Sequence, residues 1–137
     1  MGQARDVTEG WFKDVPTGDV KRWLHPDVVF ETPVTPAMRD HTDIIGFVAS
    51  YKDGFPDSGF TLDNVWEVGD TAITEGHYTG TNTGPMQTPD GQQMPATGKT
   101  VNLPFVSIIQ AKDGKMISHR VYWDQAGFAA QLGMAPK

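Results

Sequence analysis

The spacing of apolar residues changes near residue 60, and this change restricts the chain to folds that combine leading helices with a separate sheet. In the first half, apolar residues recur at the i, i+3, i+4 and i+7 positions of one helix face, at Ile44, Phe47, Val48 and Tyr51. From Phe60 onward, apolar and polar residues mostly alternate, as in strands that bury one face. This order predicts an α+β fold with helices on one face of an antiparallel sheet.

Capping residues and prolines predict the bounds of the helices. A first helix should end before Pro16, and a short second helix should follow a cap at Thr17 and reach Leu24. Asp40 or Thr42 should cap the helix that carries the apolar stripe. A final helix over residues 125–132 should follow a cap at Asp124.

Strands are predicted at residues 27–32, 60–68, 71–81, 101–111 and 116–123. In the second of these, Phe60, Leu62, Trp66 and Val68 have the same parity and should share one face. Asp113-Gly114 should form the tight turn of the last hairpin. Residues 83–99 are rich in proline and glycine, and the sequence leaves open whether they form a functional lid or a solvated excursion.

Length and charge narrow the classes of protein. The 137 residues fit one domain, so a single domain over residues 1–137 is expected. The net charge of −6 argues against a nucleic-acid partner, and no apolar run approaches the roughly 20 residues of a membrane span. Without cysteine there is neither a disulfide nor a thiolate metal site. The first residues are too charged for a signal peptide, so a cytoplasmic location is expected.

The histidines and serines show no metal or nucleophile motif. His25, His41, His77 and His119 lie in four separate segments, without the short spacing of paired metal ligands. No GxSxG elbow and no phosphate-binding loop is present. We therefore expect no metal and no cofactor, and carboxylate acid–base chemistry in an apolar setting is the chemistry that remains.

Asp124 is the first candidate for that chemistry. Alternation along the last strand places Asp124 on the same face as Arg120 and Tyr122, and His119 on the other. If the first face lines a pocket, Asp124 is the base, and Tyr122 and Arg120 supply donors to a developing enolate. An Asp immediately before a helix is also a good N-cap, and position alone favours that structural role.

Other residues are weaker candidates for the site. His77 and His119 alternate with apolar residues, a pattern that fits a structural histidine better than a catalytic one. The Asn82 amide is suited to bind a substrate carbonyl, although a turn role fits its Thr-Asn-Thr-Gly run at least as well. The aromatic candidates for substrate contacts, which otherwise belong to the core, are Phe47, Tyr51, Trp66 and Phe105.

Five short segments in order resemble the SnoaL-like polyketide cyclases of the nuclear transport factor 2-like and ketosteroid isomerase-like superfamily. They are Phe-Pro-Asp at 55–57, Gly-Thr-Asn-Thr-Gly-Pro at 80–85, Pro-Ala-Thr-Gly-Lys at 95–99, Asp-Gly-Lys-Met-Ile at 113–117, and Tyr-Trp-Asp-Gln at 122–125 leading into Gln-Leu-Gly at 131–133. The resemblance spans nearly the whole chain.

The resemblance implies a cone formed by a curved antiparallel sheet wrapped around helices, with a homodimer through the outer face of the sheet. It also implies cofactor-free chemistry in which an Asp at the end of the last strand, here Asp124, removes a proton next to carbonyl groups. One departure is Asn82, where many relatives have histidine in a Gly-Thr-His-Thr-Gly segment. If that histidine transfers protons in the relatives, this chain has either moved the role, for example to His77 or His119, or performs different chemistry.

Several functions therefore stay open. The leading hypothesis is a cyclase or isomerase acting on an apolar, enolisable carbonyl compound such as a polyketide intermediate. An epoxide hydrolase-like enzyme would need carboxylates that converge on a water, and Glu31, Glu75 and Asp124 are scattered in sequence. A non-catalytic pocket protein for an apolar ligand is an alternative, and a structural dimerisation domain would be favoured if Trp and Phe side chains filled the pocket.

Overall fold

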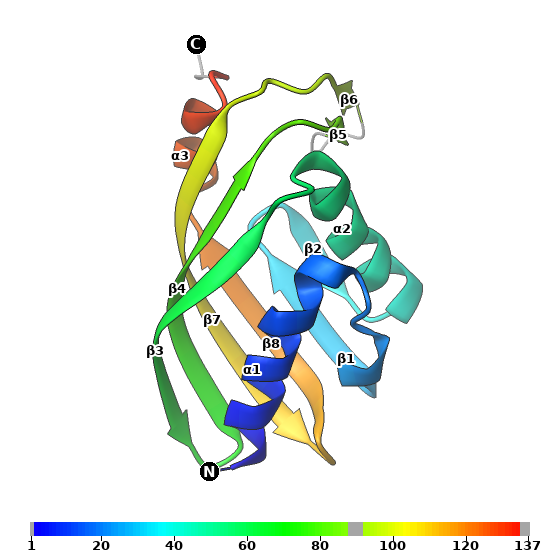
Figure 1. The fold of residues 1–137 in the computed structure, drawn as a ribbon. Coiled ribbons are helices and arrows are strands. Elements are labelled where there is room, and N and C mark those ends of the chain that lie inside the picture. Colours follow the sequence, from blue (N-terminus) through cyan, green and yellow to red (C-terminus); the bar gives the residue numbers. More distant parts are fainter. Residues whose placement is uncertain (1, 88–91, 135–137) are drawn as a thin grey trace.

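The computed structural model describes residues 2–87 and 92–134, and it has a curved six-stranded sheet that wraps around two helices (Figure 1). The sheet has the order β2-β1-β8-β7-β4-β3. Its strands are β1 (Leu24–Thr32), β2 (Thr35–Met38), β3 (Gly59–Val68), β4 (Thr71–Thr81), β7 (Thr100–Lys112) and β8 (Lys115–Trp123). A separate small hairpin pairs β5 (Met86–Gln87) with β6 (Gln93–Met94).

The leading helices lie on the inner face of the sheet, as the sequence predicts. They are α1 (Gln3–Asp14) and α2 (His41–Gly54), and the short α3 (Gln125–Gln131) follows the last strand (Figure 1). α1 buries Val7, Trp11 and Phe12 against the sheet. Asp40 caps α2, since its side chain accepts a hydrogen bond from the Thr42 amide at 2.7 Å. The α+β fold is confirmed.

One pairing in the sheet differs from the antiparallel arrangement that we expected. β1 pairs in parallel with β8, whereas the other strand pairs are antiparallel. The sheet is therefore mixed. Sequence patterns locate the strands but do not give their order in the sheet. That order depends on contacts between distant segments, here between β1 and β8.

The predicted second helix is wrong. Residues 15–17 and 21–23 form two 3₁₀ turns, and Leu24 already begins β1. Gly18 interrupts the segment with a φ of 81°, a left-handed conformation that glycine adopts readily and that no α-helix contains.

A bulge in β3 reverses which residues of that strand face the core, so the predicted common face is wrong. The pairing with β4 shifts register between Leu62 and Asn64, so one extra residue is inserted and the parity reverses. Phe60 and Leu62 pack against the core, but Trp66 and Val68 point to the outer face, where they are 50% and 73% exposed. The two pairs do not share one face.

The last hairpin turns where the sequence predicts. Asp113 and Gly114 connect β7 and β8 with φ values of 55° and 73°, the left-handed pair that an Asp-Gly turn supplies.

Of the helices in residues 2–87 and 92–134, none is both long and apolar enough to cross a lipid bilayer.

Candidate functional site

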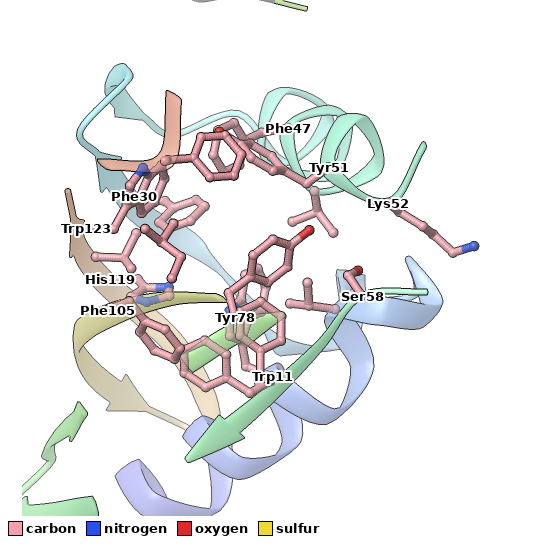
Figure 2. Close-up of a pocket in the computed structure, with 17 residues that line it drawn as sticks. Trp11, Phe30, Phe47, Tyr51, Lys52, Ser58, Tyr78, Phe105, His119 and Trp123 are labelled. Atoms are coloured by element: carbon pink, nitrogen blue, oxygen red, sulfur yellow. The ribbon is translucent and has the colours of Figure 1, made fainter. Parts of the chain in front are cut away.

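The inner face of the sheet and the two leading helices enclose an apolar cavity of about 90 Å³ (Figure 2). Its lining comes from α1, α2, α3 and the inner positions of five strands. The residues are Trp11, Phe12, Val15, Phe30, Phe47, Val48, Tyr51, Lys52, Ser58, Phe60, Tyr78, Leu103, Phe105, His119, Val121, Trp123 and Phe128. Ten of these residues are Phe, Tyr or Trp, and they leave the cavity between them.

His119 is the buried imidazole of the cavity wall. It is 1% exposed, and its Nε2 lies 2.8 Å from the Ser107 hydroxyl on the neighbouring strand β7. The ring stacks on Phe30, with centroids 4.7 Å apart, and meets the edge of Trp11 at 5.7 Å. Burial lowers the pKa of His119 to about 3, because the charged ring would lose its hydration. The imidazole is therefore neutral at pH 7.

Two tyrosines also line the cavity, together with Lys52 and Ser58. Burial raises the pKa of Tyr78 to about 12, and it also raises the pKa of Tyr51 well above its ordinary value. Both phenols therefore stay protonated at neutral pH. The Tyr78 hydroxyl interacts with the Ser58 hydroxyl. His119 Nδ1 is buried and has no hydrogen-bond partner among the described residues.

Several predicted site residues lie on the opposite face of the sheet. His119, Val121 and Trp123 line the cavity, whereas Arg120 and Tyr122 alternate with them and point outward, Tyr122 with 52% exposure. Neither of the two reaches the inner cavity, although Tyr122 borders a hollow on the outer face that His77 also lines.

His77 and Trp66 belong to the outer face as well. His77 pairs with Asp63, its Nδ1 lying 2.7 Å from a carboxylate oxygen, and both side chains are partly exposed. Trp66 follows the β3 bulge and faces away from the cavity. Of the aromatic candidates, Phe47, Tyr51 and Phe105 do line the cavity.

Asp124 is exposed and does not line the cavity. Its carboxylate accepts a hydrogen bond from the Gly127 amide at 2.9 Å, which makes it the N-cap of α3. This is the structural role that its position before a helix predicted. The neighbouring Trp123 does reach the cavity, so the last strand contributes to the cavity through that residue.

Asn82 holds a loop and does not face the cavity. Its side chain is fully buried and donates to the Gly54 and Gly84 carbonyls at 3.0 and 2.9 Å. Its carbonyl oxygen accepts from the amide and the hydroxyl of Thr97. The turn alternative therefore describes its place best. Of the proline-rich segment at 83–99, residues 88–91 lie outside the described part of the chain.

A second cavity of about 300 Å³ adjoins the first. The two share the side chains of Phe47, Tyr51 and Phe128, which stand between them. Four methionines also line the second cavity, at 38, 86, 94 and 134, and methionine side chains adapt easily to irregular shapes.

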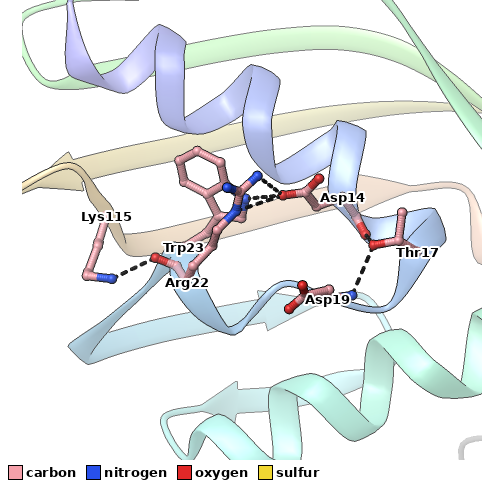
Figure 3. A network of polar contacts seen from close by, with 6 residues as sticks. All are labelled: Asp14, Thr17, Asp19, Arg22, Trp23 and Lys115. Carbon is pink, nitrogen blue, oxygen red and sulfur yellow. Dashed lines mark hydrogen bonds and ion pairs between the residues drawn. The ribbon is translucent and has the colours of Figure 1, made fainter.

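A separate polar cluster, around Asp14, lies outside both cavities (Figure 3). Asp14 Oδ2 accepts from Arg22 Nε and Nη2 at 3.0 and 2.6 Å and from Trp23 Nε1 at 2.8 Å. Lys115 donates to the Arg22 carbonyl at 2.6 Å. These contacts fix the 3₁₀ segment between α1 and β1, which is a structural role.

Within the described residues, no three or more His, Asp or Glu side chains lie close enough together to hold a metal ion. Sequence reasoning missed the polar lining residues Lys52, Ser58 and Tyr78, and also Ser107, the hydrogen-bond partner of His119. A parity signal was available for Ser107. It alternates with the inward Leu103, Phe105 and Ile109, so its hydroxyl is a polar group in a buried row.

The chain belongs to the SnoaL-like domain family, whose model matches residues 8–119. A comparison with curated protein sequences found no match.

Solved structures share the fold at low identity. A proposed SnoaL-like polyketide cyclase from Jannaschia sp. CCS1 is 23% identical, with a TM-score of 0.83 over 98% of this chain and 94% of that one. IdmH from Streptomyces antibioticus, described as a proposed polyketide cyclase, is 22% identical, with a TM-score of 0.79 over 96% and 99%. A protein from Catenulispora acidiphila with a ketosteroid isomerase-like fold, solved with trimethylamine, is 15% identical, with a TM-score of 0.76 over 95% and 93%. At these identities the likeness concerns the fold alone.

Proposed function

We propose that the protein is a cofactor-independent cyclase or isomerase for an apolar, enolisable carbonyl compound, with the reacting carbonyl in the inner cavity. The observation that carries this proposal is the neutral imidazole of His119 in an aromatic cavity, whose Nδ1 has no hydrogen-bond partner among the described residues, with the protonated phenol of Tyr78 in the same lining. Groups of this kind stabilise the negative charge that develops on a carbonyl oxygen.

Ring closure by aldol addition suits such a cavity. β-Dicarbonyl compounds enolise without a strong base, so holding the enol carbon against the acceptor carbonyl supplies much of the rate enhancement. As the new carbon–carbon bond forms, the enol hydroxyl loses its proton and becomes a carbonyl, while the acceptor oxygen gains one and becomes a hydroxyl, so no net proton is lost. The low dielectric of an aromatic wall strengthens each hydrogen bond to the developing alkoxide. Asp124, which lies outside the cavity, has no part in this scheme beyond capping α3.

The size of the two cavities bears on the substrate. The inner cavity, at about 90 Å³, is smaller than the roughly 300–1,000 Å³ of most ligand pockets. A polyketide-sized molecule would therefore place its reacting end in the inner cavity and the rest in the methionine-lined second one. Phe47, Tyr51 and Phe128 would have to move for a ligand to span both.

Turnover of a compound panel tests the proposal. Purified protein is incubated with methyl esters of short polyketides and related β-dicarbonyl compounds, and products are followed by mass spectrometry. Loss of one hydrogen-bond donor to a developing oxyanion typically lowers kcat by about 100-fold or more. We therefore expect losses of that size in His119→Phe and in Tyr78→Phe, which keep an aromatic ring at each site.

Asp124→Asn is the matched control, because Asn also caps helices well but has no basic carboxylate. Unchanged turnover in Asp124→Asn is expected. A large loss in this variant alone would return the catalytic role to Asp124. If compounds bind but none reacts, a non-catalytic pocket protein becomes the better description.

We also propose that the protein forms a homodimer through the outer face of the sheet. Large apolar side chains lie exposed there on β3, β4, β7 and β8: Trp66, Val68, Ile73, Val106 and Tyr122. Apolar and aromatic groups of this kind are typical of the buried core of protein interfaces. We further propose a cytoplasmic location.

A further inference from the structure

We propose that the second cavity accepts ligand tails of different shapes, because flexible methionine side chains line it, while the rigid aromatic wall of the inner cavity restricts the reacting end. This inference deepens the proposed function and rests on it for a ligand that spans both cavities. It adds where the protein discriminates between ligands, and it names the residues that make one half of the site permissive.

Four methionines converge on the second cavity from separate parts of the chain. Met38 ends β2, Met86 and Met94 lie on the β5–β6 hairpin, and Met134 follows α3. The fifth methionine in the described part of the chain, Met116, is fully buried in the core. A methionine side chain is unbranched and has a polarisable sulfur, so it packs well against surfaces of different shape. Met38, Met94 and Met134 are only partly buried, which leaves them room to adjust to a ligand.

The wall of the inner cavity is built from rings that hold one another in place. The Phe30 ring stacks on His119 with centroids 4.7 Å apart and makes an edge contact with Trp11 at 5.9 Å. The rings of Phe12 and Phe105 lie 5.2 Å apart. These side chains have fewer rotatable bonds than methionine and are packed on several sides. A bulkier reacting end therefore has to force close-packed rings apart, which costs free energy.

The polar side chains of the second cavity do not fix the position of a tail. The Ser50 hydroxyl donates to a backbone carbonyl at 2.7 Å, and the Thr35 hydroxyl shares a hydrogen bond with a neighbouring threonine at 2.9 Å. Gln125 Oε1 accepts from the Trp123 indole at 2.8 Å. Asp43 is exposed, so its carboxylate stays in contact with water. Apolar contact, which is not directional, therefore dominates the binding of a tail.

Binding of four β-diketones, measured by isothermal titration calorimetry, tests the inference. 2,4-Decanedione, 1-cyclohexyl-1,3-butanedione and 1-phenyl-1,3-butanedione share an acetyl end and carry a linear, a saturated cyclic and a flat aromatic tail of equal carbon number. We expect the wild type to bind these three with Kd values within about threefold of one another. 2,2-Dimethyl-3,5-undecanedione has the linear tail and a tert-butyl group in place of the acetyl methyl. It should bind about tenfold more weakly than 2,4-decanedione, because the added bulk meets the rigid wall.

The triple variant Met38→Ile, Met94→Ile, Met134→Ile tests the role of the methionines. Isoleucine is apolar and similar in size, but its branch at Cβ makes it stiff. In this variant the Kd values of the three acetyl-ended compounds should spread over about tenfold, while the weaker binding of the tert-butyl compound should remain. Met116→Ile is the matched control, because Met116 lines neither cavity, and it should keep the wild-type pattern.

The outcomes separate this inference from the proposed function. A tenfold spread among the three tails in the wild type, or equal binding of the tert-butyl compound, overturns the inference, about tenfold being the threshold in Kd. An unchanged narrow spread in the triple variant overturns it as well. Turnover of panel compounds alongside any of these results would leave the proposed function standing. Even binding of the three tails without turnover would refute the enzymatic function and leave this inference standing, whereas binding of none of the compounds overturns both.

Discussion

Acidification to pH 5 should destabilise the protein mainly through His119, and a His119→Phe variant should escape this loss. In the unfolded chain the imidazole takes up a proton below about pH 6.5. In the folded protein it stays neutral until about pH 3, because burial opposes the charge. Between these two values the unfolded state binds one more proton than the folded state, so stability falls as the pH falls.

The expected magnitude follows from this difference. Each pH unit inside the window changes the free energy of unfolding by about 1.4 kcal/mol. Of the interval from pH 7 to pH 5, the part below about pH 6.5, about 1.5 pH units, lies inside this window. The free energy of unfolding therefore falls by about 2 kcal/mol. Three carboxylates have a lowered pKa: Asp14, Asp57 and Glu67. They stabilise the fold at pH values above their ordinary pKa, and this contribution is lost at lower pH, outside most of the interval from pH 7 to pH 5.

Urea denaturation followed by circular dichroism at pH 7 and pH 5 measures the effect. Phe at position 119 keeps an aromatic ring against Phe30 but removes the titrating group and leaves Ser107 without its partner, so its stability at pH 7 will differ. The quantity to compare is therefore the change between the two pH values. His77→Gln, on the exposed outer face, should keep the wild-type change. Equal losses in wild type and His119→Phe would refute the burial of a neutral His119.

Three further outcomes follow from other parts of the structure. Asn82→Ala should lower the free energy of unfolding by about 3 kcal/mol in urea titrations, because it deletes a buried amide with four hydrogen bonds and leaves their partners unpaired. Asn64→Ala, at an exposed amide, is the control, and an equal loss in both variants would contradict the role of Asn82. Asp14→Asn should lower the urea midpoint. In the wild type, the stabilising contribution of Asp14 should be lost as the pH falls below its ordinary pKa of 3.8, since hydrogen bonds from Trp23 and Arg22 lower that pKa in the folded state. Asp19→Asn should change neither the urea midpoint nor its pH dependence. The double variant Trp66→Asp, Tyr122→Asp should be a monomer in analytical ultracentrifugation where the wild type is a dimer, and a monomeric wild type would refute the proposed homodimer.

Local patterns predicted most of the elements correctly. The i, i+3, i+4, i+7 stripe and the cap at Asp40 gave α2, and Asp113-Gly114 gave the last hairpin turn. These features succeed because they depend on neighbouring residues: a helix face, a side chain that accepts an amide proton, and a backbone angle. The 3₁₀ segment at 15–23 was mistaken for a helix because the sequence did not show that Gly18 would adopt a left-handed conformation.

The candidate site was harder to predict than the elements. Phe47, Tyr51, Phe105 and His119 were named from sequence and lie around the cavity. Arg120 and Tyr122 were named on the condition that their face of β8 lines the pocket, and the structure places them on the outer face. Alternation separates two faces without saying which of them is covered by helices. The β3 bulge moved Trp66 outward through a single extra residue that the sequence pattern did not mark.

The sequence by itself therefore determined the α+β class, the SnoaL-like family and the row of apolar positions along each strand. The tertiary structure alone decided that β1 joins β8 in parallel and that α1 and α2 cover the face of the sheet with His119. It also decided that Asp124, the predicted cap of α3, lies away from the cavity. The physical reason is that propensities and caps act over a few residues. The inner face, the Ser107–His119 hydrogen bond and the cavity depend on contacts between residues distant in sequence, which form only when the whole sheet closes around the helices.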